Sequence, residues 1–253
     1  MPIITVTVLQ YRPGARLRAF ANMGRVMMKP FVAEGLTFHK LLGSGHNLGL
    51  MPNFSTYVFL GVWDTETQAE QFLASAQFEI LTQGTDDVST LYLEPYQAHG
   101  SWDGVNPFSV SSDQSRRGTA AVSSNGSTSR KPSGSLVAVL TRATIRPGAL
   151  FEFWRNVPAV RQKMADHKDN LLFAIGVGEK PVVQQCTISV WRSSEAINQF
   201  AYRQSGHKEV VRESRTRHWF NEDLFARFRV RKVSGSMGLY LNGISPETAK
   251  HET

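Results

Sequence analysis

Apolar and polar positions alternate with a period of two over residues 6–11, and this alternation predicts a β-strand. A similar pattern over residues 136–145 predicts a second strand. After the first strand the period lengthens to three and four residues, which indicates an amphipathic helix. Its apolar stripe is Leu17, Phe20, Ala21, Gly24, Met27, Met28 and Phe31, and its basic side holds Arg16, Arg18, Arg25 and Lys29. We expect the stripe to pack on the protein's own sheet; a membrane surface is the alternative for a basic amphipathic helix.

The pattern of the first part of the chain occurs a second time. Arg12-Pro13-Gly14-Ala15 recurs as Arg146-Pro147-Gly148-Ala149, each time between an extended run and a helical one. Further along each copy, Val62-Trp63 recurs as Val190-Trp191, at a slightly smaller separation in the sequence. Each copy reads strand, helix, strand, strand, helix, strand, which is the ferredoxin-like order. The chain is therefore a tandem repeat of one α+β unit.

One such unit leaves a face of its sheet uncovered, and a second unit can cover it. We expect an α+β fold in which tandem ferredoxin-like halves form a dimeric α+β barrel within one chain. The N-terminal half covers residues 1–104 and the C-terminal half, with the cofactor site, residues 136–238. A flexible Ser-rich linker of residues 105–135 joins them, because its polar composition cannot offset the entropy of ordering. Residues 239–253 form a loose tail.

Composition narrows the possible functions. Cys186 is the single cysteine among 253 residues, so a disulfide framework or a cysteine-clustered metal site within one chain is excluded. The formal net charge is +7, but the basic residues do not gather into a stripe interleaved with aromatic residues. We therefore expect no nucleic-acid partner. No apolar run reaches the ~20 residues that span a bilayer. We expect a cytoplasmic protein, with peripheral contact at the inner face of the membrane as an open alternative.

Among the seven histidines, none pairs with another at the i, i+4 spacing of a helical metal site. His207 stands out because it shares a helical face with Val210, Val211 and Ser214, so its imidazole is expected to point inward. A neutral imidazole of this kind can ligate a haem iron; a buried histidine with an ordinary hydrogen-bond partner is the alternative. When the two copies are aligned on their Val-Trp pairs, the first copy has Glu79 at this position, so only the second copy has the histidine.

Several blocks of sequence resemble the spheroidene monooxygenases, which are acyclic carotenoid 2-ketolases. The blocks are FHKLLGSG (38–45), LTRATIRP (140–147), FWRNVP (153–158), FAIGVGEKP (173–181) and QCTISVW (185–191), followed by a segment containing His207, Trp219 and Phe220. The resemblance covers residues 3–108 and 136–234. It implies a haem-dependent oxygenase that inserts oxygen at the C-2 region of an acyclic carotenoid, by hydroxylation or ketolation.

The resemblance also implies the cofactor and its partners. The cofactor would be haem b, with His207 as the axial ligand of its iron and Trp219 and Phe220 as further pocket residues. The implied partners are the apolar carotenoid, dioxygen and a ferredoxin-type electron donor. His39 departs from the family, which tends to have an aromatic residue there.

Arg142 is a further candidate, for a haem propionate or the distal pocket, because it shares a strand face with Leu140 and an inward arginine requires a partner. An ordinary salt bridge at the barrel rim is the alternative for this residue. No other catalytic residue is assigned. Five aromatic residues of the second copy would suit the wall of a haem pocket, and an ordinary position near a core is the alternative for them: Trp154, Phe173, Trp191, Trp219 and Phe220.

Two other functions remain open at this point. One is a haem-dependent enzyme of the same barrel fold that acts on a different small apolar substrate, because a fold does not determine its chemistry. The other is a non-catalytic module that binds haem or an apolar ligand.

Overall fold

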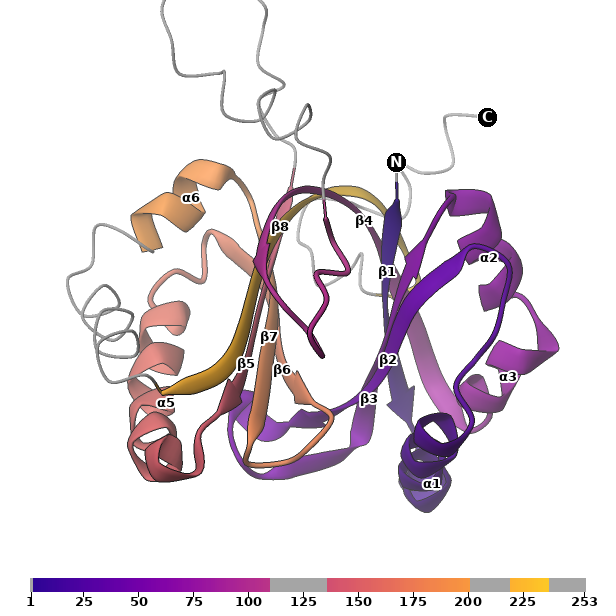
Figure 1. The fold of residues 1–253 in the computed structure, drawn as a ribbon, viewed down its shortest axis with the longest axis horizontal. Helices are drawn as coiled ribbons and strands as arrows, with labels where there is room; N and C mark the ends of the chain where they lie inside the picture. Colours follow the sequence, from indigo (N-terminus) through magenta and orange to yellow (C-terminus); the bar gives the residue numbers. More distant parts are fainter. Residues whose placement is uncertain (1, 110–135, 201–218, 237–253) are drawn as a thin grey trace, which may run out of the picture.

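The computed structural model describes residues 2–109, 136–200 and 219–236. Their strands form a closed barrel, and helices lie on its outside (Figure 1). The strands are β1 (Ile3–Tyr11), β2 (Leu36–Gly45), β3 (Pro52–Trp63), β4 (Thr85–Gly100), β5 (Val137–Ile145), β6 (Leu171–Gly178), β7 (Gln184–Trp191) and β8 (Phe220–Ser234). The helices are α1 (Arg16–Met28), α2 (Glu66–Leu73), α3 (Ala76–Thr82), α5 (Leu150–Ala165) and α6 (Ser194–Asn198). Short 3-10 turns are η1 (Pro13–Ala15), η2 (His46–Leu48) and η3 (Pro147–Ala149).

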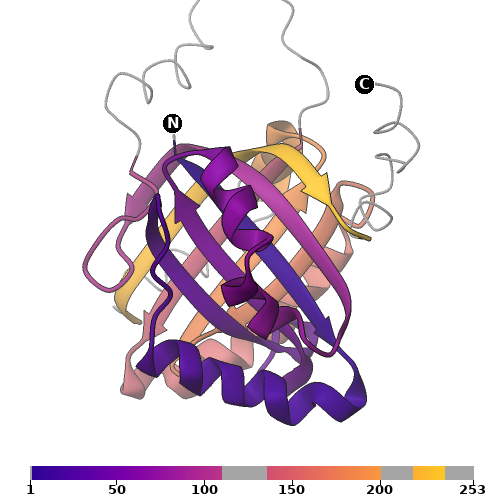
Figure 2. The same cartoon turned by 90° about the vertical axis from the view of Figure 1, so that its right-hand side faces the viewer.

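The barrel consists of two similar halves. Its strand order is β1-β3-β2-β6-β7-β5-β8-β4, and the paired strands are antiparallel. The halves meet where β2 pairs with β6 and where β4 pairs with β8. Helices α1–α3 lie outside the first half and α5 and α6 outside the second (Figures 1 and 2). This arrangement confirms the expected α+β barrel of tandem ferredoxin-like halves.

The interior of the barrel is filled by side chains from every strand, as period-two alternation requires. The segment after β4 also contributes to this core: Trp102 and Phe108 are buried, and the Phe108 ring lies 5.2 Å from that of Phe228. Residues 105–109 therefore differ from the flexible linker expected there, because Phe108 is apolar enough to enter the core. The rest of that segment, 110–135, and the tail 239–253 lie outside the described residues.

Helix α1 forms where it was expected but presents the opposite side to the sheet. Its buried residues are Ala19, Asn22 and Val26, whereas Leu17 and Met28 of the apolar stripe are each 85% exposed. The expectation that the stripe packs on the protein's own sheet is therefore wrong, except at its last residue, Phe31, which lies beyond the helix. The reason is steric. Large side chains of the sheet, Tyr11, Tyr57 and Phe59, already fill the space, so only small residues of α1 fit against them.

None of the described helices is long and apolar enough to cross a membrane.

Candidate functional site

The ladder registers of the two halves allow their outward-facing residues to be compared. In the first half Leu9 pairs with Tyr57. In the second half Ala143 pairs with Gln185, and both residues lie at the positions that the recurring motifs assign to Leu9 and Tyr57. The first and third strands of each half therefore pair in the same register, so residues at equivalent positions of the two copies can be compared directly.

The outer face of the second sheet has much smaller side chains than that of the first. Four large residues are replaced at equivalent ladder positions: Leu9 by Ala143, His39 by Ala174, Leu41 by Gly176 and Phe59 by Thr187. In the first half Leu9, Leu41 and Phe59 are buried under α1–α3. In the second half the side chains at these positions do not extend as far from the sheet as their counterparts do, so the described residues leave more room there.

Helix α5 stands away from this face. It is described throughout, and of its 16 residues only Met164 is buried, whereas the 13-residue α1 buries three. The α5 residues at the positions of the three buried α1 residues are only half-buried: Phe153, Asn156 and Val160. The space left by the small sheet residues is therefore not filled by the helix that covers them.

A pocket of about 330 Å³ opens between α5, β6 and η2, and we call it the α5 pocket. Its walls include Leu48 of η2, Arg161, Met164 and Ala165 of α5, and Ala174 and Gly176 of β6. A Cβ atom on Gly176 would lie 2.8 Å from the Leu48 Cα atom, so the close approach of η2 requires glycine here. The walls combine small side chains with the exposed guanidinium of Arg161, which can pair with an acidic group of a bound molecule.

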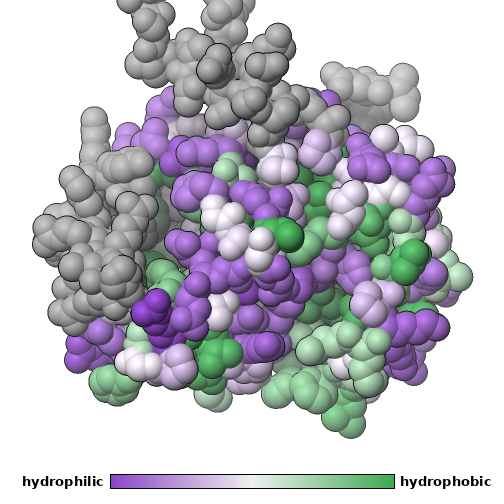
Figure 3. Space-filling model, viewed as in Figure 1, coloured by the Kyte–Doolittle hydropathy of each residue, from purple (hydrophilic) through white to green (hydrophobic). Residues whose placement is uncertain are grey.

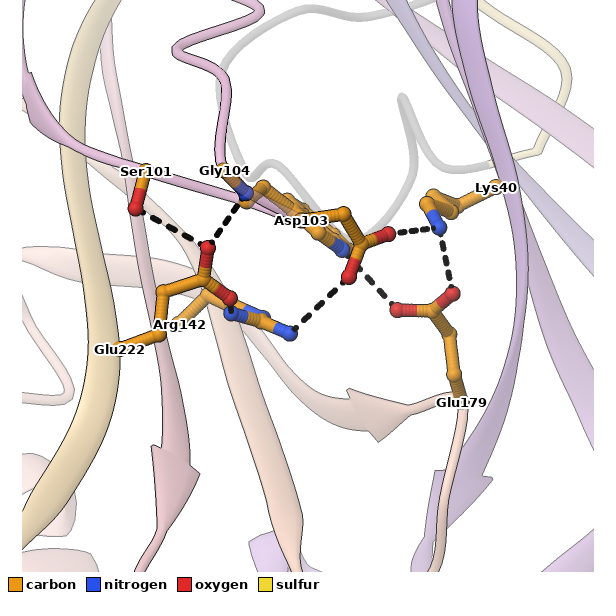
Figure 4. A network of polar contacts seen from close by, with 8 residues as sticks. Lys40, Ser101, Asp103, Gly104, Arg142, Glu179 and Glu222 are labelled. Atoms are coloured by element: carbon orange, nitrogen blue, oxygen red, sulfur yellow. Dashed lines mark hydrogen bonds and ion pairs between the residues drawn. The ribbon is translucent and has the colours of Figure 1, made fainter.

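The interior of the barrel holds a separate polar network (Figure 4). Arg142, 3% exposed, donates to Glu222. The Glu222 carboxylate also accepts hydrogen bonds from the Ser101 hydroxyl at 2.9 Å and from the backbone N–H of Gly104 at 2.8 Å. Strands β5 and β8 are thus joined to the segment that follows β4.

A second ion pair in this network comes from the first half. Lys40 of β2 contacts Asp103 at 2.5 Å and Glu179 at 2.7 Å, and the Trp102 indole donates to Glu179 at 2.9 Å. Burial alone would lower the pKa of Lys40, but the two carboxylates raise it above its ordinary value. The network therefore fixes both halves to residues 101–104 at one end of the barrel.

Arg142 points into the barrel, and the α5 pocket lies on the outside of the sheet. The salt bridge considered as its alternative is present, and a cofactor contact of Arg142 stays a prediction. The described residues around Arg142 and Cys186 leave no space there that a water molecule could occupy. Cys186 is buried, and burial raises the pKa of its thiol, as expected of a core residue. We therefore regard the interior as packed core and the α5 pocket as the candidate site.

The Glu222 carboxylate predicts an acid-dependent loss of stability. Burial alone would raise its pKa, but the Gly104 amide, the Arg142 guanidinium and the Ser101 hydroxyl lower it from 4.5 to about 2. Because the folded-state pKa is depressed, the stabilisation is present above about pH 4.5 and is lost as the pH falls towards 2. We expect it to amount to about 2–3 kcal/mol.

Urea unfolding at about pH 6 and about pH 3 measures this contribution, with Glu222→Gln as the reference. The variant should be less stable than the wild type at the higher pH, and the difference should shrink at the lower pH. An equal difference at both values would contradict the depressed pKa.

The five aromatic residues belong to three different clusters of side chains. Trp154, Trp219 and Phe220 pack around the start of α5, together with Ile145 and Ala149. Trp191 belongs to another cluster, which contains Ala196 and Ile197 of α6. Phe173 packs against the core inside the barrel. His207 lies outside the described residues.

The described histidines do not assemble a metal site. Within residues 2–109, 136–200 and 219–236, no group of three or more His, Cys, Asp or Glu side chains could hold a metal ion. His39 stacks on Phe59 with ring centroids 5.9 Å apart, so it packs as an aromatic residue does, and burial lowers its pKa. The His167 ring nitrogen Nδ1 lies 3.0 Å from the Lys163 carbonyl oxygen. The contacts of His39 and His167 are therefore those of side chains that contribute to packing and hydrogen bonding.

Sequence reasoning missed the small residues of the sheet. Ala143, Ala174, Gly176 and Thr187 carry no reactive group, so a search for chemistry passes over them. A position-by-position comparison of the two copies would have found Ala143 and Thr187, but only the ladder registers identify Gly176, because the Gly-x-Gly motifs of the two copies pair it with Gly43. Arg161 was missed as well, because nothing in its sequence surroundings distinguishes it from other basic helix residues.

Comparisons with known proteins agree with this architecture. A family model described as a domain of unknown function (DUF3291) matches residues 142–228. Spheroidene monooxygenase of Rhodobacter capsulatus is 30% identical over 240 residues, which cover 93% of this chain and 93% of that protein. Spheroidene monooxygenase of Cereibacter sphaeroides is 34% identical over 199 residues, covering 76% of this chain and 55% of that longer protein.

A solved structure shows the same fold. The crystal structure of an aldoxime dehydratase superimposes with a TM-score of 0.59 at 13% identity, over 91% of this chain and 82% of that one. At this identity the likeness concerns the fold alone.

Proposed function

The chain belongs to the spheroidene monooxygenase family, and from this membership we propose that it is a haem-dependent monooxygenase acting at the C-2 region of an acyclic carotenoid. The observation that carries the proposal is the 30% identity to the Rhodobacter capsulatus protein over 93% of both chains. The relatives' shared name supports the oxygenase class and the carotenoid substrate. The haem and the site residues rest on the resemblance around His207 and on the fit of the α5 pocket.

Three features of the α5 pocket and its surroundings suit a haem. Small side chains, Ala143, Ala174 and Thr187 among them, form a bed on the outer face of the sheet, and Ala174 also lines the pocket. Arg161 supplies a cation for the propionates. Trp219, which packs at the start of α5 and thus at the opposite end of that helix from Arg161, is buried, and its indole N–H has no hydrogen-bond partner among the described residues, so it is free to donate to a group bound at that end.

His207 is the residue that we propose would hold the haem iron. The described residues that flank its segment, Phe200 and Trp219, pack at the two ends of the outer face of the second sheet. A bound haem would supply dioxygen activation, and insertion of one oxygen atom into the substrate with release of the other as water would consume two electrons and two protons from the donor. The chain itself has to orient the apolar substrate and exclude water. A ferredoxin-type protein is the proposed electron donor.

His207→Ala tests the ligand. Protein purified from haem-replete cells should show a Soret band, and the substitution should remove or shift it. We expect oxygenation to fall by about 100-fold or more, because changes merely next to a metal ligand already cost about 10–100-fold. His218→Ala, in the same segment, is the matched control and should keep both the spectrum and the activity. An unchanged spectrum in His207→Ala would refute the assignment.

Product analysis tests the reaction. In cells that accumulate acyclic carotenoids, expression of the protein should yield pigments that carry one or two more oxygen atoms, as hydroxyl or keto groups. Unchanged pigments from a haem-loaded protein that turns over with reductant and dioxygen would favour a different small apolar substrate. A haem-loaded protein without any turnover would favour a binding module.

A further inference from the structure

The outer side of α1 is apolar and exposed. Leu17 is 85% exposed, Phe20 60%, Met27 65% and Met28 85%. Next to them, Met51 and Phe54 near the start of β3 are 71% and 47% exposed. We call these six residues the α1 face. Figure 3 shows hydrophobic residues gathered at the lower right, where α1 lies in Figure 1.

Helix α1 and the hairpin between β2 and β3 form one continuous surface. The rings of Phe20 and Phe54 lie edge to face with centroids 6.0 Å apart, and Arg16 Nε donates to Ser55 Oγ at 2.7 Å. The opposite side of α1 is held by Ala19, Asn22 and Val26. The apolar side chains are therefore displayed by a helix whose position is already fixed by packing.

Positive charge surrounds the α1 face. Residues 1–33 contain no aspartate or glutamate, and the basic residues among them are exposed: Arg12, Arg16, Arg18, Arg25 and Lys29. At about 100° per residue, Arg18, Arg25 and Lys29 lie on one flank of the apolar stripe and Arg16 on the other. Long basic side chains beside an apolar strip can lay their stems along it and keep their charged ends in water.

We propose that the α1 face docks on a lipid bilayer that contains anionic lipids. An apolar stripe between two basic flanks is the arrangement of helices that lie in the membrane interface. A second copy of this chain would bring the same positive charges together, which disfavours self-association through the face. Anionic headgroups would instead attract each basic residue near the surface.

The hairpin between β2 and β3 connects the docking surface with the α5 pocket. Leu48 lines the pocket, and Met51, a little further along the same hairpin, belongs to the α1 face. A membrane-dissolved apolar substrate would therefore meet the pocket close to the lipid surface. The docking itself does not depend on the proposed function.

Vesicle flotation of the full-length protein tests the proposal. The probes are phosphatidylcholine vesicles with about 30% phosphatidylglycerol and vesicles of phosphatidylcholine alone. The wild type should float with the anionic vesicles and bind the neutral ones more weakly. Leu17→Ser/Phe20→Ser/Met28→Ser should lower the partition coefficient by about 100-fold or more, because each buried apolar side chain contributes about tenfold. Val105→Ser, which changes an apolar residue that is 54% exposed outside the α1 face, is the matched control and should bind normally.

Charge variants separate the two contributions. Arg18→Gln/Arg25→Gln/Lys29→Gln should lower the preference for anionic vesicles by about fivefold for each residue replaced, with Arg12 and Arg16 retaining the remainder. Far-UV circular dichroism and thermal melting show whether the variants remain folded.

Three results would overturn the proposal. The first is a folded wild type that floats with neither kind of vesicle, and the second is a triple serine variant that floats as well as the wild type. The third is a concentration-dependent dimer in sedimentation velocity that the serine substitutions dissociate, with no vesicle binding. Flotation requires neither haem nor carotenoid, so failure of the proposed function would leave this result unaffected.

Discussion

Arg142→Met should destabilise the protein by about 3–5 kcal/mol, because removing one partner of a buried ion pair leaves the other charge without compensation. Arg142 is 3% exposed and donates to Glu222, and its second terminal nitrogen lies 3.9 Å from Asp103. The methionine matches the length of the lost side chain but not its charge. Glu222 would then remain in the barrel end with only the Ser101 and Gly104 donors.

Urea unfolding at neutral pH measures this loss. Arg12→Met is the matched control: its ion pair with Asp86 is exposed on both sides, so the change should stay within about 0.5 kcal/mol. The double variant Arg142→Met/Glu222→Leu should recover much of the stability, because both charges are then absent. A loss below about 1 kcal/mol in Arg142→Met would show that the network is solvated and not structural.

Thr187→Phe should prevent haem from binding while leaving the barrel folded. Phe59 is the residue at this ladder position in the first half, where it fills the space under the helices. In the second half the same ring would occupy the proposed cofactor bed. We expect the haem content to fall by about tenfold or more, since ~1.4 kcal/mol of strain or lost packing is already a factor of ten.

The Soret absorbance per protein measures the haem content of this variant, and its melting temperature shows whether the barrel remains folded. Thr187→Val is its matched control, because it removes the hydroxyl without adding volume, and it should retain haem. Ala143→Leu, the counterpart of Leu9, should act as Thr187→Phe does. Full haem loading in both enlarged variants would place the cofactor elsewhere.

Helix α1 illustrates a limit of periodicity. The spacing of Leu17, Phe20 and Met28 identified a helix with an apolar side, but not the surface that this side meets. The large residues of the sheet left room only for Ala19, Asn22 and Val26. Which side of a helix packs depends on the volume that the opposing surface leaves, and that volume is set by strands far along the chain.

Arg142 illustrates a different limit. Period-two alternation correctly placed it on the face of Leu140, and a buried arginine was expected to need a partner. Its partners are Asp103, which belongs to the segment after β4, and Glu222, which belongs to the last strand. The sequence around Arg142 does not indicate which remote residues will become its partners.

The sequence by itself determined the tandem repeat, the order of elements in each copy and the barrel that two copies build, because these follow from local periodicity and from motifs that recur in the same order. It also identified the family through blocks that are contiguous in the chain. Tertiary structure alone decided that α1 turns its apolar stripe outward, that Phe108 enters the core and that the described residues leave space on the outer face of the second sheet beneath α5. These features depend on the volumes and charges that remote residues bring together, and only the folded chain defines them.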